Sequence, residues 1–201
     1  MQIAPLTLDG HHIRLAPMSE SHLEGLCLAG LHESVWKLAV DRMQTRQDMA
    51  NYMAAALADQ GSGNAIPFVT IDRASNRVIG STRFGNIERT HRRVEIGWTW
   101  LTPLWQRTAA NTEAKYLMLR HAFETWGCLR VELKTDVLNQ KSRQAMLRIG
   151  AREEGILRSH MVVWDGRRRD SIFFSILDHE WPAVKARLES WLTDDPAARS
   201  A

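Results

Sequence analysis

Cysteine is scarce in this sequence. Its 201 residues include two, Cys27 and Cys128, which lie far apart and lack neighbours with the spacing of metal ligands. A disulfide framework and a metal site are therefore not expected, and a reducing cytoplasm is the expected compartment. Long apolar runs are also missing, since no segment approaches the roughly 20 apolar residues that cross a membrane. Residues 1–5 lack the basic start of a signal peptide, so we expect no such leader.

A strong excess of either charge is missing too. Lys and Arg number 26 against 23 Asp and Glu, which leaves a net charge of +3. Two basic clusters stand out, Arg89 to Arg93 and Arg167 to Arg169. Each fits either the solvated end of a hairpin or a site for an anionic ligand or nucleic acid. Nucleic acid is the less expected partner, because no aromatic residues interleave with these clusters.

Hydrophobic periodicity gives an order of elements. Alternation indicates strands at 6–8, 13–15, 66–72, 77–86, 92–101, 129–137, 152–164 and 168–177, and helical spacing indicates helices at about 20–31, 47–59, 111–126, 139–149 and 181–192. The order is a strand or hairpin, two helices, three antiparallel strands, a helix, a strand, a helix and two strands. Because no repeat or linker divides the chain, we expect one α+β domain over residues 1–192. The tail, residues 193–201, is expected to be disordered.

The stretch Gln106 to Lys115 carries the clearest functional signal. It joins a strand to an amphipathic helix through a loop of small polar residues. The free N–H groups of a first helical turn and the positive end of its dipole attract anions. Small side chains let the backbone approach a ligand closely. The sequence therefore predicts a diphosphate site at this loop, although a plain strand–helix connection is the alternative.

These elements and the sequences along them resemble the GNAT superfamily of acyl-CoA-dependent N-acetyltransferases, most of all its RimJ/RimL-type branch. The matching stretches span nearly the whole chain and are Ile13–Pro17, Val94–Trp98, Asn111–Lys115, Asn139–Ser142, Gly150–Gly155 and Arg169–Asp170. The resemblance implies a mixed twisted sheet of about seven strands flanked by helices, with a splay between strands four and five. One departure is visible: in the family loop pattern Q/R-x-x-G-x-G/A, Ala109 and Asn111 stand at the glycine positions.

The resemblance also implies where acetyl-CoA would bind. The pantetheine arm pairs with the fourth strand in this family, and the diphosphate lies on the loop before the central helix. The implied binding residues are Trp98, Thr99, Trp100, Leu101, Gln106, Arg107, Thr108, Ala109, Ala110, Asn111 and Thr112, with Asn139 orienting the pantetheine. A backbone N–H near Trp100 is the implied donor to the thioester oxygen.

Two side chains are candidates for catalysis. Acyl transfer needs a base for the ammonium group of the acceptor and a group that stabilises the leaving thiolate. Glu95 is the candidate base, on a strand face with Gly97 and Thr99. Its alternative role is an ordinary strand carboxylate paired with Arg83 or Arg92. Ser142 is the candidate for the thiolate, and its alternative role is a helix-capping pair with Asn139.

The leading hypothesis is an enzyme that moves an acetyl group from acetyl-CoA to a primary amine by direct attack in a ternary complex. The acceptor is open: a protein N-terminus or a small amine, with the basic clusters and the tryptophans favouring an acidic or aromatic one. The alternative is a CoA-binding or partner-binding protein without turnover. Edge strands at the C-terminal hairpin make a homodimer conceivable.

Overall fold

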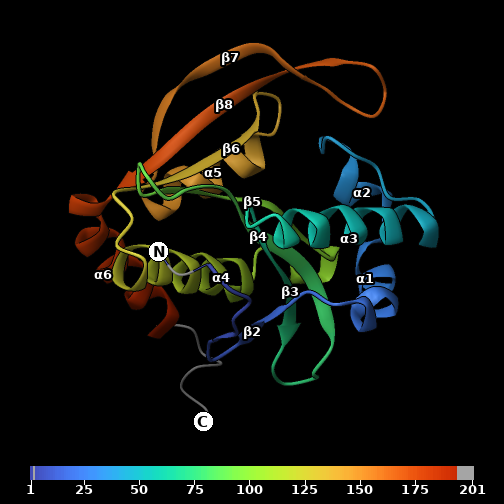
Figure 1. Cartoon of the computed structure of the whole chain (residues 1–201), viewed down its shortest axis with the longest axis horizontal. Coiled ribbons are helices and arrows are strands. Elements are labelled where there is room, and N and C mark those ends of the chain that lie inside the picture. The colour runs from blue at the N-terminus through green and yellow to red at the C-terminus, as the bar shows by residue number, and fades with distance from the viewer. Residues whose placement is uncertain (2, 194–201) are drawn as a thin grey trace.

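A computed structural model of the chain describes residues 1 and 3–193 (Figure 1). Apart from Thr193, the predicted tail lies outside these residues. The described residues form one eight-stranded sheet in the order β1-β2-β3-β4-β5-β6-β8-β7. The strands are β1 (Leu8–Asp9), β2 (Ile13–Pro17), β3 (Ile66–Asp72), β4 (Val78–Glu88), β5 (Arg93–Leu101), β6 (Arg130–Asp136), β7 (Arg152–Val162) and β8 (Arg168–Leu177). The α+β prediction is confirmed, with eight strands instead of about seven because the opening segment is a hairpin of two.

Helices cover both faces of the sheet. They are α1 (Leu23–Gly30), α2 (Glu33–Trp36), α3 (Arg46–Gly61), α4 (Ala109–Arg120), α5 (Gln140–Ile149) and α6 (Trp181–Thr193). A large apolar core joins α4, α5 and α6 to one face, and a smaller core joins α1, α2 and α3 to the other. Because β3 lies between these two cores, all its residues are buried. The short helix α2 is absent from the sequence prediction.

Most strand neighbours are antiparallel, and β5 and β6 form the one parallel pair between described strands. The chain passes from β5 through α4 to β6, and then through α5 to β7 and β8, of which β8 pairs with β6. A parallel pair needs such a helical crossover, whereas antiparallel neighbours need only a turn. The hairpin of β7 and β8 arches over the top of Figure 1, and the N–H of Trp164 near its tip donates to the carbonyl of Val40, 2.9 Å away. The hairpin therefore closes one side of the molecule.

Glu113 of α4 fixes the first hairpin to the central helix. Its carboxylate accepts the backbone N–H groups of His11, His12 and Ile13 at 2.6, 2.8 and 2.8 Å, and the residue is 4% exposed. A Cβ atom at Gly10 would lie 2.4 Å from the Glu113 carboxyl carbon, so only glycine leaves room for this contact. The glutamate within the Asn111–Lys115 motif is thus a structural anchor of the helix that follows the phosphate-type loop.

We expect Glu113→Ala to destabilise the protein by about 2–4 kcal/mol, because it removes a charged acceptor from three backbone donors. Urea unfolding followed by circular dichroism measures the change. Glu24→Ala is the matched control, since Glu24 forms an exposed ion pair with Arg46 and should cost less than about 1 kcal/mol. Equal losses in the two variants would contradict the anchoring role.

No helix in residues 1 and 3–193 combines the length and apolar character that crossing a membrane requires. The His, Cys, Asp and Glu side chains of the same residues form no cluster of three or more able to hold a metal ion. Cys27 and Cys128 are free thiols. Burial is the main cause that raises the pKa of the Cys128 thiol, to about 11, which leaves it protonated and unreactive at neutral pH.

Candidate active site

The two parallel strands separate after a short contact. Pairing covers Arg93–Glu95 of β5 and Arg130–Glu132 of β6. Beyond these residues, β5 continues to Leu101 beside β4, and β6 continues to Asp136 beside β8. The facing edges of β5 and β6 therefore diverge, which confirms the predicted splay and leaves backbone groups available to an extended ligand.

Two helices begin at the open end of this splay. After β5 a 3-10 turn, Pro103–Trp105, leads to α4, and after β6 a short turn leads to α5. Thr108 caps α4 by accepting the N–H of Ala110 at 3.3 Å, and Asn139 caps α5 by accepting the N–H of Ser142 at 3.1 Å. The carboxyl ends of parallel strands and the N-termini of the following helices are favourable places for anionic ligands.

The loop before α4 departs from the glycine pattern in an unexpected way. Arg107 has a φ of +64°, in the left-handed region that favours glycine, and Ala109 is the first helical residue. The loop therefore places its left-handed residue two positions before the expected glycine site. A cavity of about 430 Å³ lies beside this helix start and is lined by His11, His12, Asp72, Ala74, Trp105, Thr108, Ala109 and Ala110.

A bulge reorders the side chains along β5. Arg83 pairs with Gly97 and Ser81 with Trp100, so Thr82 alone faces the two residues Trp98 and Thr99. Trp98 has a φ of +50°. An extra residue of this kind shifts every later side chain to the other face.

The predicted faces of β5 are therefore wrong beyond Gly97. Val94, Ile96 and Leu101 join the core around α4, and Thr99 lies on the same face because its hydroxyl accepts from Lys115 of α4. Glu95, Trp98 and Trp100 lie on the opposite face, where Trp100 packs into the core of α1 and α3. Strict alternation predicts that Glu95 and Thr99 lie on the same face of the sheet. Because of the bulge, Glu95 instead shares its face with Trp98.

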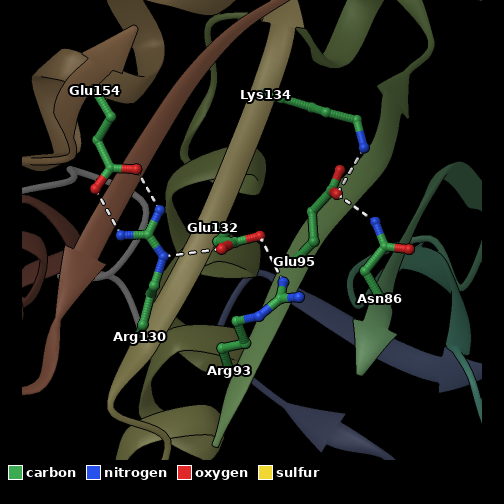
Figure 2. Close-up of polar contacts among 7 residues, drawn as sticks. All are labelled: Asn86, Arg93, Glu95, Arg130, Glu132, Lys134 and Glu154. Atoms are coloured by element: carbon green, nitrogen blue, oxygen red, sulfur yellow. Dashed lines mark hydrogen bonds and ion pairs between the residues drawn. The ribbon is translucent and has the colours of Figure 1, made fainter. Parts of the chain in front are cut away.

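Glu95 is buried and bound on one oxygen. Its Oε2 accepts from Lys134 Nζ and from Asn86 Nδ2, both at 2.7 Å, and the residue is 3% exposed (Figure 2). The predicted partners Arg83 and Arg92 are not the ones it has. Oε1 lies over Gly97, where a Cβ atom would come within 2.8 Å. The glycine thus leaves room for the second carboxylate oxygen.

A row of alternating charges crosses the strands at this level. Figure 2 shows Glu154 of β7 and Arg130 of β6 joined in a two-pronged ion pair, and Arg130 also donates to Glu132 at 2.8 Å. Glu132 then accepts from Arg93 of β5 at 3.1 Å. These contacts hold β5 against β6 up to the last paired residues. The ion pair of Glu95 with Lys134 then joins the two strands where the splay begins.

A cavity of about 550 Å³ opens on the Glu95 face. It lies over β4, β5, β6 and β8, between the end of α3 and the hairpin of β7 and β8, and its lining includes Asp59, Asn86, Glu95, Trp98, Lys134, His160 and Phe173. The Trp98 ring stands between two cations, with Arg83 Cζ at 4.8 Å and Lys134 Nζ at 5.6 Å from its centroid. Gly85 makes room for that ring, since a Cβ atom there would lie 2.4 Å from it.

Lys115 approaches the splay from the α4 side. Its Nζ donates to Thr99 Oγ1 at 2.8 Å, and the residue is 7% exposed. Burial, the larger cause, lowers the pKa of the Lys115 ammonium to about 7, and the carboxylate of Glu95 acts in the opposite direction. Periodicity predicts an outward-facing lysine at this position. The burial of Lys115 could not be predicted from the sequence, because it depends on the bulge that turns Thr99 toward α4.

We expect the stability of the protein to rise between pH 7 and pH 9 through Lys115. In this range the unfolded lysine, with a pKa near 10.5, keeps its proton while the folded one loses it, so unfolding takes up a proton. The gain approaches about 1.4 kcal/mol for each pH unit above the folded pKa. Urea unfolding of the wild type and of Lys115→Met at several pH values measures it. The variant should lack this component, and parallel pH dependences would refute the expectation.

The other predicted site residues lie at the splay or its open end. The Gln106 amide donates to the carbonyl of Leu101 at 3.2 Å, which closes the loop after β5, and Thr112 accepts from Arg148 of α5 at 2.8 Å. Leu101 and Trp100 have buried side chains, so only their backbone edges are offered to the splay. Asn139 and Ser142 form the capping pair described above, which leaves the Ser142 hydroxyl without a bond to any described residue.

Among the described strands, the sheet splays at its one parallel pair, and two helices begin at the open end. The model of the "Acetyltransferase (GNAT) domain" family matches residues 12–152. This chain therefore belongs to the GNAT acetyltransferase family.

Individual relatives agree with that assignment. A GCN5-related N-acetyltransferase structure from Brucella melitensis is 33% identical, with 96% of this chain and 87% of that chain covered and a TM-score of 0.88. YdaF of Bacillus subtilis, provisionally named a ribosomal N-acetyltransferase, is 32% identical over 53% of this chain. The chain spans 57% of YdaF in that match. RimJ of Mycobacterium smegmatis, solved in complex with CoA-disulfide, has the same fold at 22% identity over 89% of this chain and 88% of that chain, with a TM-score of 0.76.

Proposed function

We propose that this protein is an N-acetyltransferase that moves an acetyl group from acetyl-CoA to a primary amine, by direct attack of the amine in a ternary complex. The observation that carries the proposal is the splay of β5 and β6 after Glu95 and Glu132, with the starts of α4 and α5 at its open end. Family membership supports the same reaction class.

The residues present fit an acyl-CoA donor. The diverging edge of β5 from Trp98 to Leu101 suits strand-like pairing with the amide groups of a pantetheine arm. The first turn of α4 offers backbone N–H groups next to the small side chains of Ala109 and Ala110, as a diphosphate needs. We assign Gln106 to Thr112 and Asn139 to donor binding. Acetyl-CoA supplies an activated thioester. The residues of the protein hold the two substrates in position, donate hydrogen bonds and transfer the proton.

The bulge gives the site its candidate oxyanion donor. Two residues of β5, Trp98 and Thr99, face a single residue of β4, so their N–H groups are not both engaged in the β4 ladder. We assign a backbone N–H from Trp98 to Trp100 to the developing oxyanion. Ser142, at the start of α5, is assigned to the departing thiolate because its hydroxyl is not used in the cap.

Glu95 is the proposed proton acceptor for the amine. Its Oε2 is held by Lys134 and Asn86, its Oε1 lies over Gly97 and accepts no hydrogen bond from a described residue, and the residue lines the cavity. A carboxylate oriented on one oxygen and open on the other suits base catalysis, directly or through water. The acceptor enters from the 550 Å³ cavity, and it is either a protein N-terminus, as the name of YdaF suggests for that relative, or a small amine.

We expect Ala109→Trp to abolish acetyl-CoA binding, because an indole at the start of α4 blocks the approach of a diphosphate to the backbone. Isothermal titration with acetyl-CoA measures the loss, and the rise in melting temperature that the ligand gives the wild type should disappear. Ala54→Trp, at an exposed position of α3, is the control. Binding of normal strength by Ala109→Trp would exclude this loop as the diphosphate site.

We expect Glu95→Gln to lower the rate at neutral pH by about 10²- to 10⁴-fold while acetyl-CoA affinity hardly changes. The rate should recover as pH rises and the free amine form of the acceptor prevails. Glu154→Gln is the control, because it removes a carboxylate from the same charged row outside the cavity. The measurement is the pH–rate profile of thiol release, and an unchanged profile in Glu95→Gln would remove Glu95 from the mechanism.

The competing proposal is a CoA-binding protein without turnover. Its one support is the loop, where Ala109 and Asn111 stand at the glycine positions of the family pattern. Titration that shows acetyl-CoA binding, together with no thiol release over a wide panel of amines, would favour it over the enzyme.

A further inference from the structure

Arg169 is a buried cation on the face of the sheet that carries Glu95. It is 6% exposed. Its neighbours Ile172 and Phe174 on β8 join the core around α4, so alternation places Arg169, Ser171 and Phe173 on the opposite face. Phe173 lines the 550 Å³ cavity, which confirms that orientation. Arg169 therefore lies on the same face of the sheet as Glu95 and the cavity, beyond the end of β6, although it is not one of the residues that line that cavity.

The guanidinium of Arg169 has no hydrogen bond to any described residue, and its Nε is fully buried. The carboxylates that could pair with it are engaged elsewhere. Asp136 accepts from Arg167 at 2.6 Å and from the N–H of Leu138 at 2.9 Å, and Glu95 is bound by Lys134 and Asn86. Buried charges in proteins are normally paired, so an unpaired guanidinium requires a partner that the described residues do not supply.

The surrounding electrostatics point to a singly charged partner. Burial lowers the pKa of the Arg169 guanidinium from its usual range, and the positive charge of Arg167 lowers it further. The carboxylate of Asp136, and to a lesser extent that of Glu95, raises this pKa. Asp136 and Glu95 are the two carboxylates that act on this charge. Two carboxylates nearby would repel a doubly charged phosphate more strongly than a carboxylate. A second unsatisfied donor, the Ser171 hydroxyl, is fully buried on the same face two residues away.

We propose that Arg169, assisted by Ser171, binds a carboxylate group of the acceptor, so that the acceptor is an amino acid or another amine that carries a carboxylate close to the reacting nitrogen. The planar guanidinium fork matches the two oxygens of a carboxylate. Glu95 and Arg169 then hold the two ends of one zwitterion, with the ammonium group at Glu95 and the carboxylate at Arg169. This inference rests on the proposed acetyltransferase function and specifies its acceptor.

Matched pairs of acceptors test the proposal. Thiol release is measured with L-phenylalanine and 2-phenylethylamine, L-tryptophan and tryptamine, L-histidine and histamine, and β-alanine and ethylamine. We expect the carboxylated member of at least one pair to have a kcat/KM at least about tenfold above that of its partner. Arg169→Met should abolish that preference by lowering kcat/KM for the carboxylated acceptor alone. Arg169→Lys should keep part of it, because lysine retains the charge without the fork.

Two outcomes would overturn the proposal: a wild-type enzyme that shows no preference within any pair, or an Arg169→Met variant that loses both members of a pair equally. If Arg169→Met does not fold, Arg169→Lys and Ser171→Ala provide the same comparison. Weaker acetyl-CoA binding in these variants, seen by titration, would place Arg169 at the donor and also refute the proposal.

A binding measurement separates this inference from the acetyltransferase proposal. Titration of the CoA-bound protein with N-acetyl-L-phenylalanine, N-acetyl-L-tryptophan, N-acetyl-L-histidine and N-acetyl-β-alanine tests the carboxylate site without turnover. We expect at least one to bind to the wild type and at least about tenfold more weakly to Arg169→Met. No thiol release with any amine would end the acetyltransferase proposal, whereas binding of none of these four compounds would end the inference about Arg169.

Discussion

The separation of β5 from β6 after three residue pairs is the constraint on which the rest of the structure depends. Were the two strands paired along their full length, the backbone edge of β5 would be occupied and the starts of α4 and α5 would lie over a closed sheet. The ion pairs of Arg93 and Arg130 with Glu132 hold the paired end, and β4 and β8 hold the outer edges of the diverging ends. The opening is therefore supported from its two flanks, and the ion pair of Glu95 with Lys134 joins β5 to β6 where the opening begins.

The bulge at Trp98 directs neighbouring side chains of β5 to opposite faces of the sheet at this opening. It turns Thr99 toward Lys115 of α4 and Trp98 toward the cavity, so that one strand presents different chemistry on each face within two residues. Gly85 and Gly97 are part of the same device, because a side chain at either would collide with the Trp98 ring or with the Glu95 carboxylate. Gly97, the glycine of the Val94–Trp98 motif, is therefore needed to leave room for the side chain of Glu95. Its own backbone conformation is one that any residue can adopt.

Much of the fold could be predicted from the sequence, and the reasons differ between elements. Alternation and caps located β3 and β6, and Asn139 and Gly150 located the two ends of α5, because these signals are local. The bulge could not be predicted, since one extra residue on β5 is visible only against its partner β4. The resemblance indicated the splay and the place of the site, but Glu95's partners Lys134 and Asn86 come from two other strands and depend on the strand order in space.

Charge on the two sides of the opening is coupled. The carboxylate of Glu95 favours the protonated form of Lys115 from the opposite face of the sheet, and it also acts on Arg169 on its own face. Loss of this negative charge would lower the pKa of the Lys115 ammonium further. Lys115, with a pKa of about 7, is the group in which such a change alters protonation at neutral pH. The buried lysine on the α4 face and the carboxylate on the cavity face thus interact through the sheet, although the two side chains belong to different faces.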